Sequence, residues 1–276
     1  MEELRNKARA LLEKGTVQVV IGYAQGSTAA KARAVFVCSA GQTQGLIFNE
    51  HCTQNLAVYL LKPEVKALGK PAVVARLPAL RTVLQLAAEG QIADGQVVVL
   101  AVTDDGQVAE LCDLPAIEKH LAGVSLALSA QQEELVARIE KMSREQRWAF
   151  WQEQFAKCLK CYACRAACPM CYCARCVVDV NQPQWVPVAP HAVGNLEWHL
   201  VRAMHLAGRC VNCGNCAEAC PVAIPLDLLT LMLSREVGAK GTLAELVQLA
   251  KGKPGSLSYA SYGNGSSAHL AGELLR

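Results

Sequence analysis

The sequence predicts an α/β (α+β) N-terminal domain with a mixed or parallel sheet, followed by a mostly helical domain organised by cysteines. Apolar runs of strand length alternate with helix-like segments in the first half of the chain. Eleven of the fourteen cysteines lie between residues 158 and 220. Because 276 residues suffice for two domains of ordinary size, we divide the chain into residues 1–128, 129–240 and 241–276.

The N-terminal domain is expected to begin with a helix over residues 2–14, which Gly15 ends. Near-continuous apolar runs such as VVVLAV are typical of strands that a sheet buries on both faces. In chain order, we expect strands or strand-like runs at 16–23, 32–38, 45–49, 71–77 and 95–102. Helices are expected at 53–68, with a break or kink at Pro63, at 79–92 and at 116–121.

The second domain is expected to begin with one or two amphipathic helices over residues 129–157, starting at Ser129. The aromatic residues Trp148, Phe150, Trp151 and Phe155 recur at helical spacing, which predicts core packing beneath the first cysteines. A helix at about 194–207 precedes the later cysteines. After them, we expect a last helix at 242–252 and a mobile tail rich in glycine and serine over 252–276.

Composition excludes several classes of function. The formal charge of +3 comes from nearly balanced acids and bases, whereas nucleic-acid-binding proteins concentrate basic residues on one face. No apolar run approaches the length of about 18 residues that suggests a membrane span. The charged N-terminus lacks the apolar core of a signal peptide, so we expect a cytoplasmic protein. Fourteen cysteines in that reducing compartment argue against a disulfide framework.

Two stretches share the spacing C-x2-C-x2-C-x3-C-P: CLKCYACRAACP from residue 158 and CVNCGNCAEACP from residue 210. In two-cluster ferredoxins, three cysteines of such a run bind one cubane cluster and the fourth binds the other. One predicted [4Fe–4S] cluster therefore takes Cys158, Cys161, Cys164 and Cys220. The other takes Cys210, Cys213, Cys216 and Cys168, which makes this domain ferredoxin-like. Zinc sites draw four ligands from separate C-x2-C pairs and do not need this run twice.

Three further cysteines, Cys171, Cys173 and Cys176, follow the first run, and three interpretations stay open. In the first, they bind a third iron–sulfur or metal centre with a ligand from elsewhere, for which His191, His199 and His205 are candidates. In the second, one of them replaces Cys168 as the crossing ligand. In the third, they are unligated thiols packed near the clusters.

Cations surround the cysteines: Lys157, Lys160, Arg165, Arg175 and Arg209. Each could donate a hydrogen bond to cluster sulfur, raise the cluster potential or dock an acidic electron carrier. A solvated surface is the simpler interpretation for most of them.

The chain resembles the β-subunit family of the deazaflavin-coenzyme-reducing hydrogenases and the related formate dehydrogenases, over roughly residues 15–235. The specific stretches are RWAFWQEQFAKCLKCYACRAACPMCYCARC (147–176) and HLAGRCVNCGNCAEACPVAIPL (205–226). Looser matches are VIGY (20–23), LIFNEHCTQNLAVYL (46–60) and the strand–helix–strand at 72–102. The resemblance implies a subunit that passes electrons through iron–sulfur clusters and an FAD, which reduces or oxidises the deazaflavin coenzyme.

The sequence departs from this family after the strand at 71–76. The family commonly shows a Lys-Gly-Cys-Asp-Ser-Arg-like motif there, whereas this chain has RLPALR (76–81). The loop TDDGQ (103–107) also lacks the cysteine that the family tends to carry, and no G-x-G-x-x-G motif occurs elsewhere. These changes argue against FAD. If the flavin is nevertheless bound, Asn49, Asn55 and Arg81 are the candidate contacts.

We therefore predict an electron-transfer subunit of an anaerobic multi-subunit oxidoreductase rather than an enzyme in its own right. Its partners would be a catalytic subunit, from a formate dehydrogenase, hydrogenase or heterodisulfide-reductase-like complex, and a further electron-carrier protein. The first alternative is an FAD-containing oxidoreductase subunit acting on a deazaflavin or a nicotinamide. The second alternative is an iron–sulfur redox sensor.

Overall fold

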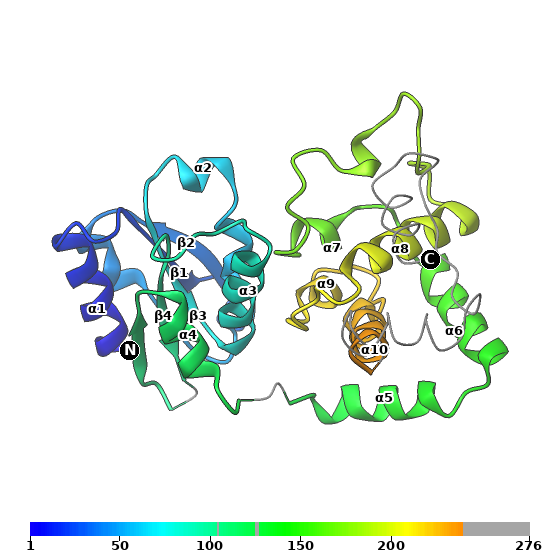
Figure 1. Cartoon of the computed structure of the whole chain (residues 1–276), viewed down its shortest axis with the longest axis horizontal. Coiled ribbons are helices and arrows are strands. Elements are labelled where there is room, and N and C mark those ends of the chain that lie inside the picture. Colours follow the sequence, from blue (N-terminus) through cyan, green and yellow to red (C-terminus); the bar gives the residue numbers. More distant parts are fainter. Residues whose placement is uncertain (104, 125–126, 240–276) are drawn as a thin grey trace, which may run out of the picture.

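The computed structural model describes residues 1–103, 105–124 and 127–239, which form two parts side by side (Figure 1). The first part is built on one sheet, and the second consists of helices joined by long loops. The predicted helix at 242–252 and the predicted tail lie outside the described residues. None of the described helices is long and apolar enough to cross a membrane.

A five-stranded mixed sheet forms the first part, in the order β2-β1-β3-β4-β5. The three central strands run parallel: β1 (Val19–Gln25), β3 (Pro71–Ala75) and β4 (Val98–Val102). The edge strands, β2 (Ala32–Val37) and β5 (Val108–Leu111), run antiparallel to their neighbours. Every residue of β3 and β4 is buried, as expected for continuous apolar runs covered on both faces. The predicted sheet is thus confirmed in its mixed form.

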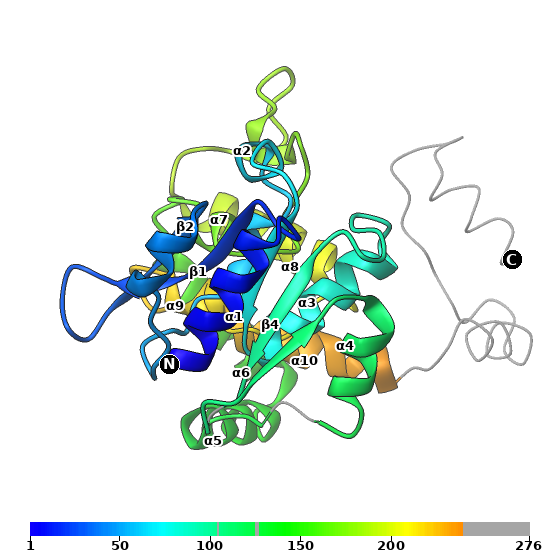
Figure 2. The same ribbon diagram turned by 90° about the vertical axis from the view of Figure 1, so that its left-hand side faces the viewer.

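Helices cover both faces of this sheet (Figures 1 and 2). Helix α1 (Glu2–Glu13) packs against β1, β4 and β5, and Gly15 beyond its end has a φ of +67°, as a helix-ending glycine often does. On the opposite face, α3 (Leu77–Ala88) packs against β3 and β4, and α4 (Leu114–Leu121) packs beside it. These helices confirm the predicted alternation of strands and helices.

The predicted break at Pro63 is confirmed, but the α-helix predicted from residue 53 up to it is wrong. A short 3-10 turn, η2 (Leu56–Tyr59), is capped by the Asn55 side chain, which accepts from the Ala57 N–H at 3.1 Å. Pro63 then begins the separate one-turn helix α2 (Pro63–Lys66). Because proline lacks an N–H, it starts a helix more readily than it continues one.

Two further differences concern short segments. The apolar run 45–49 makes a single bridge, between Ile47 and Tyr23, after the 3-10 helix η1 (Ala40–Gly45). Strand β5 was not predicted, since it has only four residues and exposes the polar Glu110.

The second part begins with α5 (Ala130–Glu140) and α6 (Arg144–Ala156), and each starts at a serine with a complete capping box, as Ser129 predicts. The remaining elements are short except for α8 and α10: α7 (Ala163–Ala166), η3 (Val177–Asp179), α8 (Ala192–Leu206), α9 (Asn215–Glu218) and α10 (Leu226–Ala239). Helix α8 confirms the helix expected at about 194–207.

The core of the second part is small and aromatic. Phe155 is buried and stacks on His199, with ring centroids 4.5 Å apart, and Trp151 stacks on Phe155 at 5.7 Å. This confirms core packing for Phe155. The same prediction is wrong for Trp148, which is 47% exposed.

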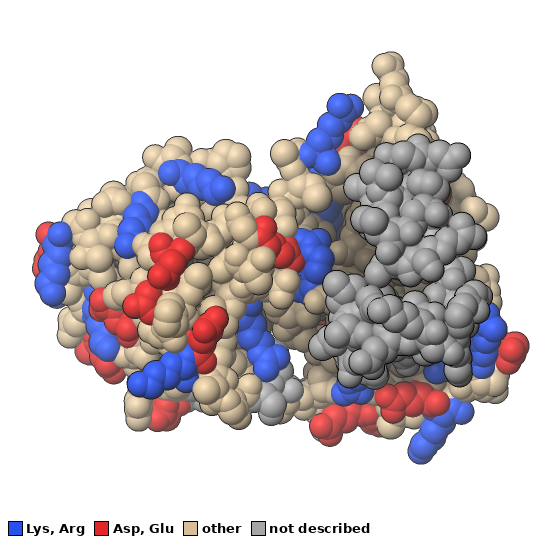
Figure 3. Space-filling view, in the orientation of Figure 1, with Lys and Arg blue, Asp and Glu red and all other residues tan. Residues whose placement is uncertain are grey.

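Surface charge is mixed over the N-terminal part. On the face that Figure 3 shows, lysines and arginines lie among aspartates and glutamates there. This face therefore carries no field of a single sign over that part, in keeping with the balanced composition.

Candidate metal centres

The two cysteine runs fold into the same loop. The residues two and four places after each first cysteine have a left-handed backbone, with φ of +57° at Lys160, +56° at Tyr162, +62° at Asn212 and +77° at Gly214. Each loop then enters a four-residue helix, α7 or α9. Left-handed conformations are unfavourable for residues other than glycine, and they cluster at functional sites. The repeat in the sequence is therefore also a repeat in the structure.

Backbone N–H groups point at cysteine sulfurs at equivalent places in both loops. The Lys160 N–H donates to the Cys158 sulfur at 3.4 Å. The Asn212 N–H donates to the Cys210 sulfur, also at 3.4 Å. Such donors favour the thiolate form of cysteine, which is the form that binds metal.

The first thiol group combines three cysteines of the first run with the last cysteine of the second run. Burial raises the pKa of Cys158, and the nearby Cys161 and Cys220 raise it further. Burial also raises the pKa of Cys164, and the nearby Cys158, Cys161 and Cys220 raise it further. Cys161 is exposed and Cys164 is buried, so the group extends from the interior to the surface. These mutual effects indicate that the four thiols of the first predicted ligand set are neighbours.

The second thiol group has the reciprocal composition. The pKa of Cys216 is raised to about 12 and that of Cys213 to about 11, mainly by burial and in part by the nearby Cys168 and Cys210. These four thiols line one cavity, into which Arg202 also projects. The structure therefore brings together the second predicted ligand set as well.

Among the described residues, no three His, Cys, Asp or Glu side chains form a group that could hold a single metal ion. The ligand roles of the eight cysteines stay predictions.

The three additional cysteines lie in different surroundings. Cys171 packs against the core of the N-terminal part, and its backbone N–H donates to the Cys168 carbonyl at 3.1 Å. Cys173 is exposed. Cys176 packs against the core of the second part, and its backbone N–H donates to Asp179 at 3.1 Å. Their role stays a prediction.

The candidate histidines are also separate from one another. His191 caps α8, where its Nδ1 accepts from the Gly194 N–H at 3.2 Å. His199 is buried against Phe155, and burial lowers its pKa to about 4. His205 is exposed.

Several predicted cations are engaged by protein groups. Lys160 is buried, and its Nζ donates to the Pro187 carbonyl at 2.7 Å. Arg165 donates two hydrogen bonds to the Asp179 carboxylate, at 2.8 and 2.7 Å. Two cations remain exposed, as expected for a solvated surface: Lys157 and Arg175.

A buried cation that the sequence analysis missed, Arg202, lies on α8. It is 4% exposed, and its Nη2 donates to the Cys164 carbonyl at 3.3 Å. Its burial could have been predicted from the sequence, because Arg202 lies four residues after Trp198 and four before Leu206. All three therefore fall on the apolar face of the predicted helix.

Asn195 holds the first cysteine loop to α8. Its Nδ2 donates to the carbonyls of Phe155 and Cys158, at 3.1 and 2.9 Å, and the residue is 1% exposed. The loop that carries the first thiol group is therefore fixed to α8 at its start.

Replacing Asn195 by Ala is expected to destabilise the folded protein by about 1–2 kcal/mol, because two buried carbonyls lose their donor. Denaturant unfolding followed by tryptophan fluorescence measures this loss, since all four tryptophans lie in the second part. The exposed Gln152 of α6 provides the control, because Gln152→Ala should leave the unfolding midpoint unchanged. Equal midpoints for the Asn195 variant and the wild type would contradict the anchoring role.

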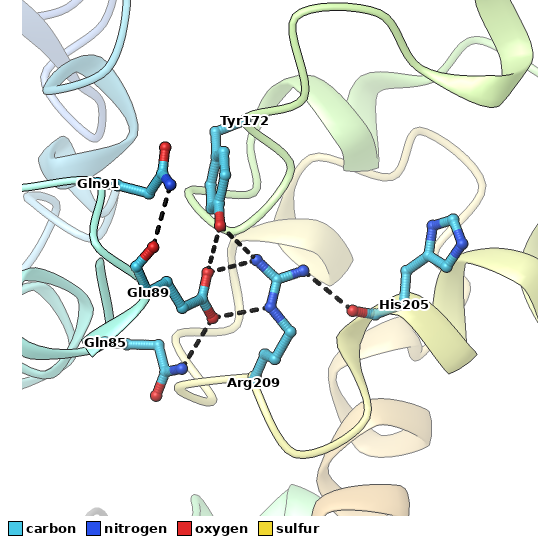
Figure 4. Close-up of polar contacts among 6 residues, drawn as sticks. All are labelled: Gln85, Glu89, Gln91, Tyr172, His205 and Arg209. Atoms are coloured by element: carbon cyan, nitrogen blue, oxygen red, sulfur yellow. Dashed lines mark hydrogen bonds and ion pairs between the residues drawn. The ribbon is translucent and has the colours of Figure 1, made fainter. Parts of the chain in front are cut away.

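A polar network joins the two parts (Figure 4). Glu89 is the C-cap residue of α3. Arg209 Nε donates to one oxygen of the Glu89 carboxylate at 2.7 Å, and Arg209 Nη2 donates to the other. The Tyr172 hydroxyl donates to the same carboxylate at 2.6 Å. The hydrogen bond from Arg209 is the main reason that the pKa of Glu89 falls to about 2. Arg209 therefore has a structural role between the parts.

Asn55 brings the N-terminal part against the second thiol group. Its backbone N–H donates to the Asn215 side chain at 3.2 Å, and Asn215 is the neighbour of Cys216 in the second run. Asn55 also borders a cavity of about 600 Å³ at the carboxyl ends of β3 and β4 and the amino end of α3. Open α/β sheets commonly bind ligands at this edge.

The structure brings only one of the three candidate flavin contacts to this cavity. Asn55 lines it, whereas Asn49 and Arg81 do not. The Asn49 carbonyl accepts from Arg76 at 2.7 Å, and Arg81 donates to the Val124 carbonyl at 3.2 Å. At the amino end of α3, proline at position 78 has no N–H to offer a phosphate.

No protein-family model matches the chain. It is 35% identical over 79 residues to the F420-dependent formate dehydrogenase subunit beta of Methanocaldococcus jannaschii, which covers 28% of this chain and 20% of that relative. It is 38% identical over 57 residues to the F420-dependent formate dehydrogenase 1 subunit beta of Methanococcus maripaludis, covering 21% of this chain and 14% of that relative. The chain thus spans a fifth or less of the curated relatives it matches, and part of it is similar to formate dehydrogenase beta subunits.

Proposed function

We propose that the chain is an electron-transfer subunit of an anaerobic multi-subunit oxidoreductase and relays single electrons through two [4Fe–4S] clusters. The observation that carries this proposal is the crossed grouping of the thiols. Each group takes three cysteines from one run and the fourth from the other, as in two-cluster ferredoxins.

The residues present fit two such clusters. The first would be held by Cys158, Cys161, Cys164 and Cys220, and the second by Cys210, Cys213, Cys216 and Cys168. Each cluster, when bound, supplies storage for one electron. The left-handed loops direct backbone N–H groups at the sulfurs, and the buried Arg202 offers a positive charge beside both groups. Both features stabilise thiolates within a largely apolar interior.

The partner that this proposal implies is a catalytic subunit, and the similarity to formate dehydrogenase beta subunits favours a formate dehydrogenase over a hydrogenase or a heterodisulfide-reductase-like enzyme. A further electron-carrier protein would complete the chain of transfer. The two parts of the molecule would have different roles in it, with the sheet acting as a docking scaffold and the helical part carrying the electrons.

A second candidate function is favoured by one observation. Asn55 lines the cavity of about 600 Å³ and donates its backbone N–H to Asn215, the neighbour of Cys216, so a flavin in that cavity would lie near the second cluster. This would make the chain an FAD-containing subunit acting on a deazaflavin or a nicotinamide. Against it stand Pro78 and the absence of Asn49 and Arg81 from the cavity lining.

The test is the content of iron, acid-labile sulfide and flavin in anaerobically purified protein. We expect about eight irons and about eight sulfides per chain, with no flavin in an acid extract. One flavin per chain with about eight irons would favour the second candidate. Iron below about one per chain after anaerobic reconstitution would refute both candidates, and iron well above eight would assign the additional cysteines to a third centre.

A further inference from the structure

Arg202 is a buried cation beside both thiol groups, since its Nη2 donates to the Cys164 carbonyl at 3.3 Å and the residue lines the cavity of the second group. Burial lowers the pKa of Arg202, and the thiols outweigh this effect and raise the pKa above its ordinary value. The contributing thiols belong to both groups: Cys164 to the first, and Cys216 and Cys168 to the second. The side chain therefore lies beside residues of both thiol groups.

The protein itself leaves this guanidinium incompletely satisfied. Its Nε is buried and has no hydrogen-bond partner, and its Nη2 has only the long contact of 3.3 Å to the Cys164 carbonyl. No carboxylate pairs with it in the described part of the chain. A buried charge without a counter-charge is costly, so the surroundings of Arg202 call for an anion. The cavity lined by the second thiol group is where the side chain projects.

We propose that Arg202 is a positioning residue that serves as one shared counter-ion for both clusters and raises the reduction potential of each. This inference rests on the proposed function. A [4Fe–4S] cluster with four thiolates is an anion, and taking up one electron adds one negative charge without requiring a proton. A fixed positive charge nearby favours the more negative, reduced form, and it acts strongly because Arg202 is itself buried away from water.

The test compares neutral and charged replacements of this one side chain. Arg202→Gln and Arg202→Met remove the charge, and Met serves where Gln loads poorly because it is apolar and of similar length. Arg202→Lys keeps the charge. Arg175→Gln is the matched control, since it removes an exposed arginine from the same cysteine-rich segment. Each protein is titrated with dithionite, and the reduction of both clusters is followed by electron paramagnetic resonance together with iron content.

In both neutral variants, the ratio of reduced to oxidised cluster at a fixed potential should fall at least tenfold for each cluster, about 59 mV for a one-electron couple. Arg202→Lys and Arg175→Gln should stay close to the wild type. Unshifted potentials in a fully loaded neutral variant would overturn the inference. A shift of one cluster alone would refute the shared role, and an equal shift in Arg202→Lys would show that charge is not the cause. Wild-type protein without clusters would instead refute the proposed function.

Discussion

Replacing Cys158 and Cys220 together by alanine is expected to leave about four irons per chain, whereas replacing Cys158 and Cys168 together should leave almost none. The first pair belongs to a single thiol group, so the second group keeps all four of its ligands. The second pair removes one ligand from each group. Iron and sulfide content after anaerobic reconstitution, with the resonance spectrum of the reduced protein, measures the difference.

The opposite pattern of iron loss would show that the ligand sets are not crossed. If each run held its own cluster, the Cys158/Cys220 variant would lose both clusters and the Cys158/Cys168 variant only one. Cys38 and Cys112 provide the matched control, because both are exposed and lie outside the runs, so their double replacement should keep about eight irons. Full iron in Cys168→Ala combined with loss in Cys171→Ala would instead identify Cys171 as the crossing ligand.

Glu89→Gln is expected to lower the free energy of unfolding by about 2–3 kcal/mol at pH 7, because it removes the negative partner of Arg209 from a largely buried site. The pKa of Glu89 falls from 4.5 to about 2 in the folded protein. A lowered carboxyl pKa stabilises the fold above the unfolded pKa. The contribution is therefore complete at neutral pH and is lost as the pH drops from about 4.5 towards 2.

The same change should also uncouple the two parts during unfolding. Tryptophan fluorescence reports only the second part, whereas far-ultraviolet circular dichroism reports both. In the wild type the two signals should change together, and in Glu89→Gln they should separate. Glu118→Gln is the control, because Glu118 is exposed on α4. A wild-type midpoint for Glu89→Gln, with the two signals still coincident, would show that the network does not hold the parts together.

Features set by local patterns could be predicted from the sequence. Continuous apolar runs gave β3 and β4, and Ser129 marked the start of α5. Equal cysteine spacing predicted two equal loops, and the left-handed residues recur at equivalent places in both. The assignment of Cys168 to the second cluster and of Cys220 to the first comes from the ferredoxin pattern and stays a prediction.

Features that depend on distant partners could not be predicted. Glu89 and Arg209 are 120 residues apart, and nothing in either neighbourhood points to the other. The segment after residue 53 has helical spacing, yet Asn55 turns its side chain to Thr82 and Ala57, and its backbone N–H to Asn215, which leaves only a short 3-10 turn. The surroundings of Arg202 also come from distant segments, because it contacts the Cys164 carbonyl of the first loop and lines a cavity with cysteines of the second.

The crossed ligand sets that we propose also have a consequence for the order of chain synthesis and cluster loading. The first thiol group has only three members until Cys220 has left the ribosome, and the second has only Cys168 until the chain passes residue 210. No nascent chain that stops before α9 holds all four cysteines of either predicted ligand set. Loading is therefore expected to follow synthesis of both runs, and a chain terminated within α8 should carry no cluster.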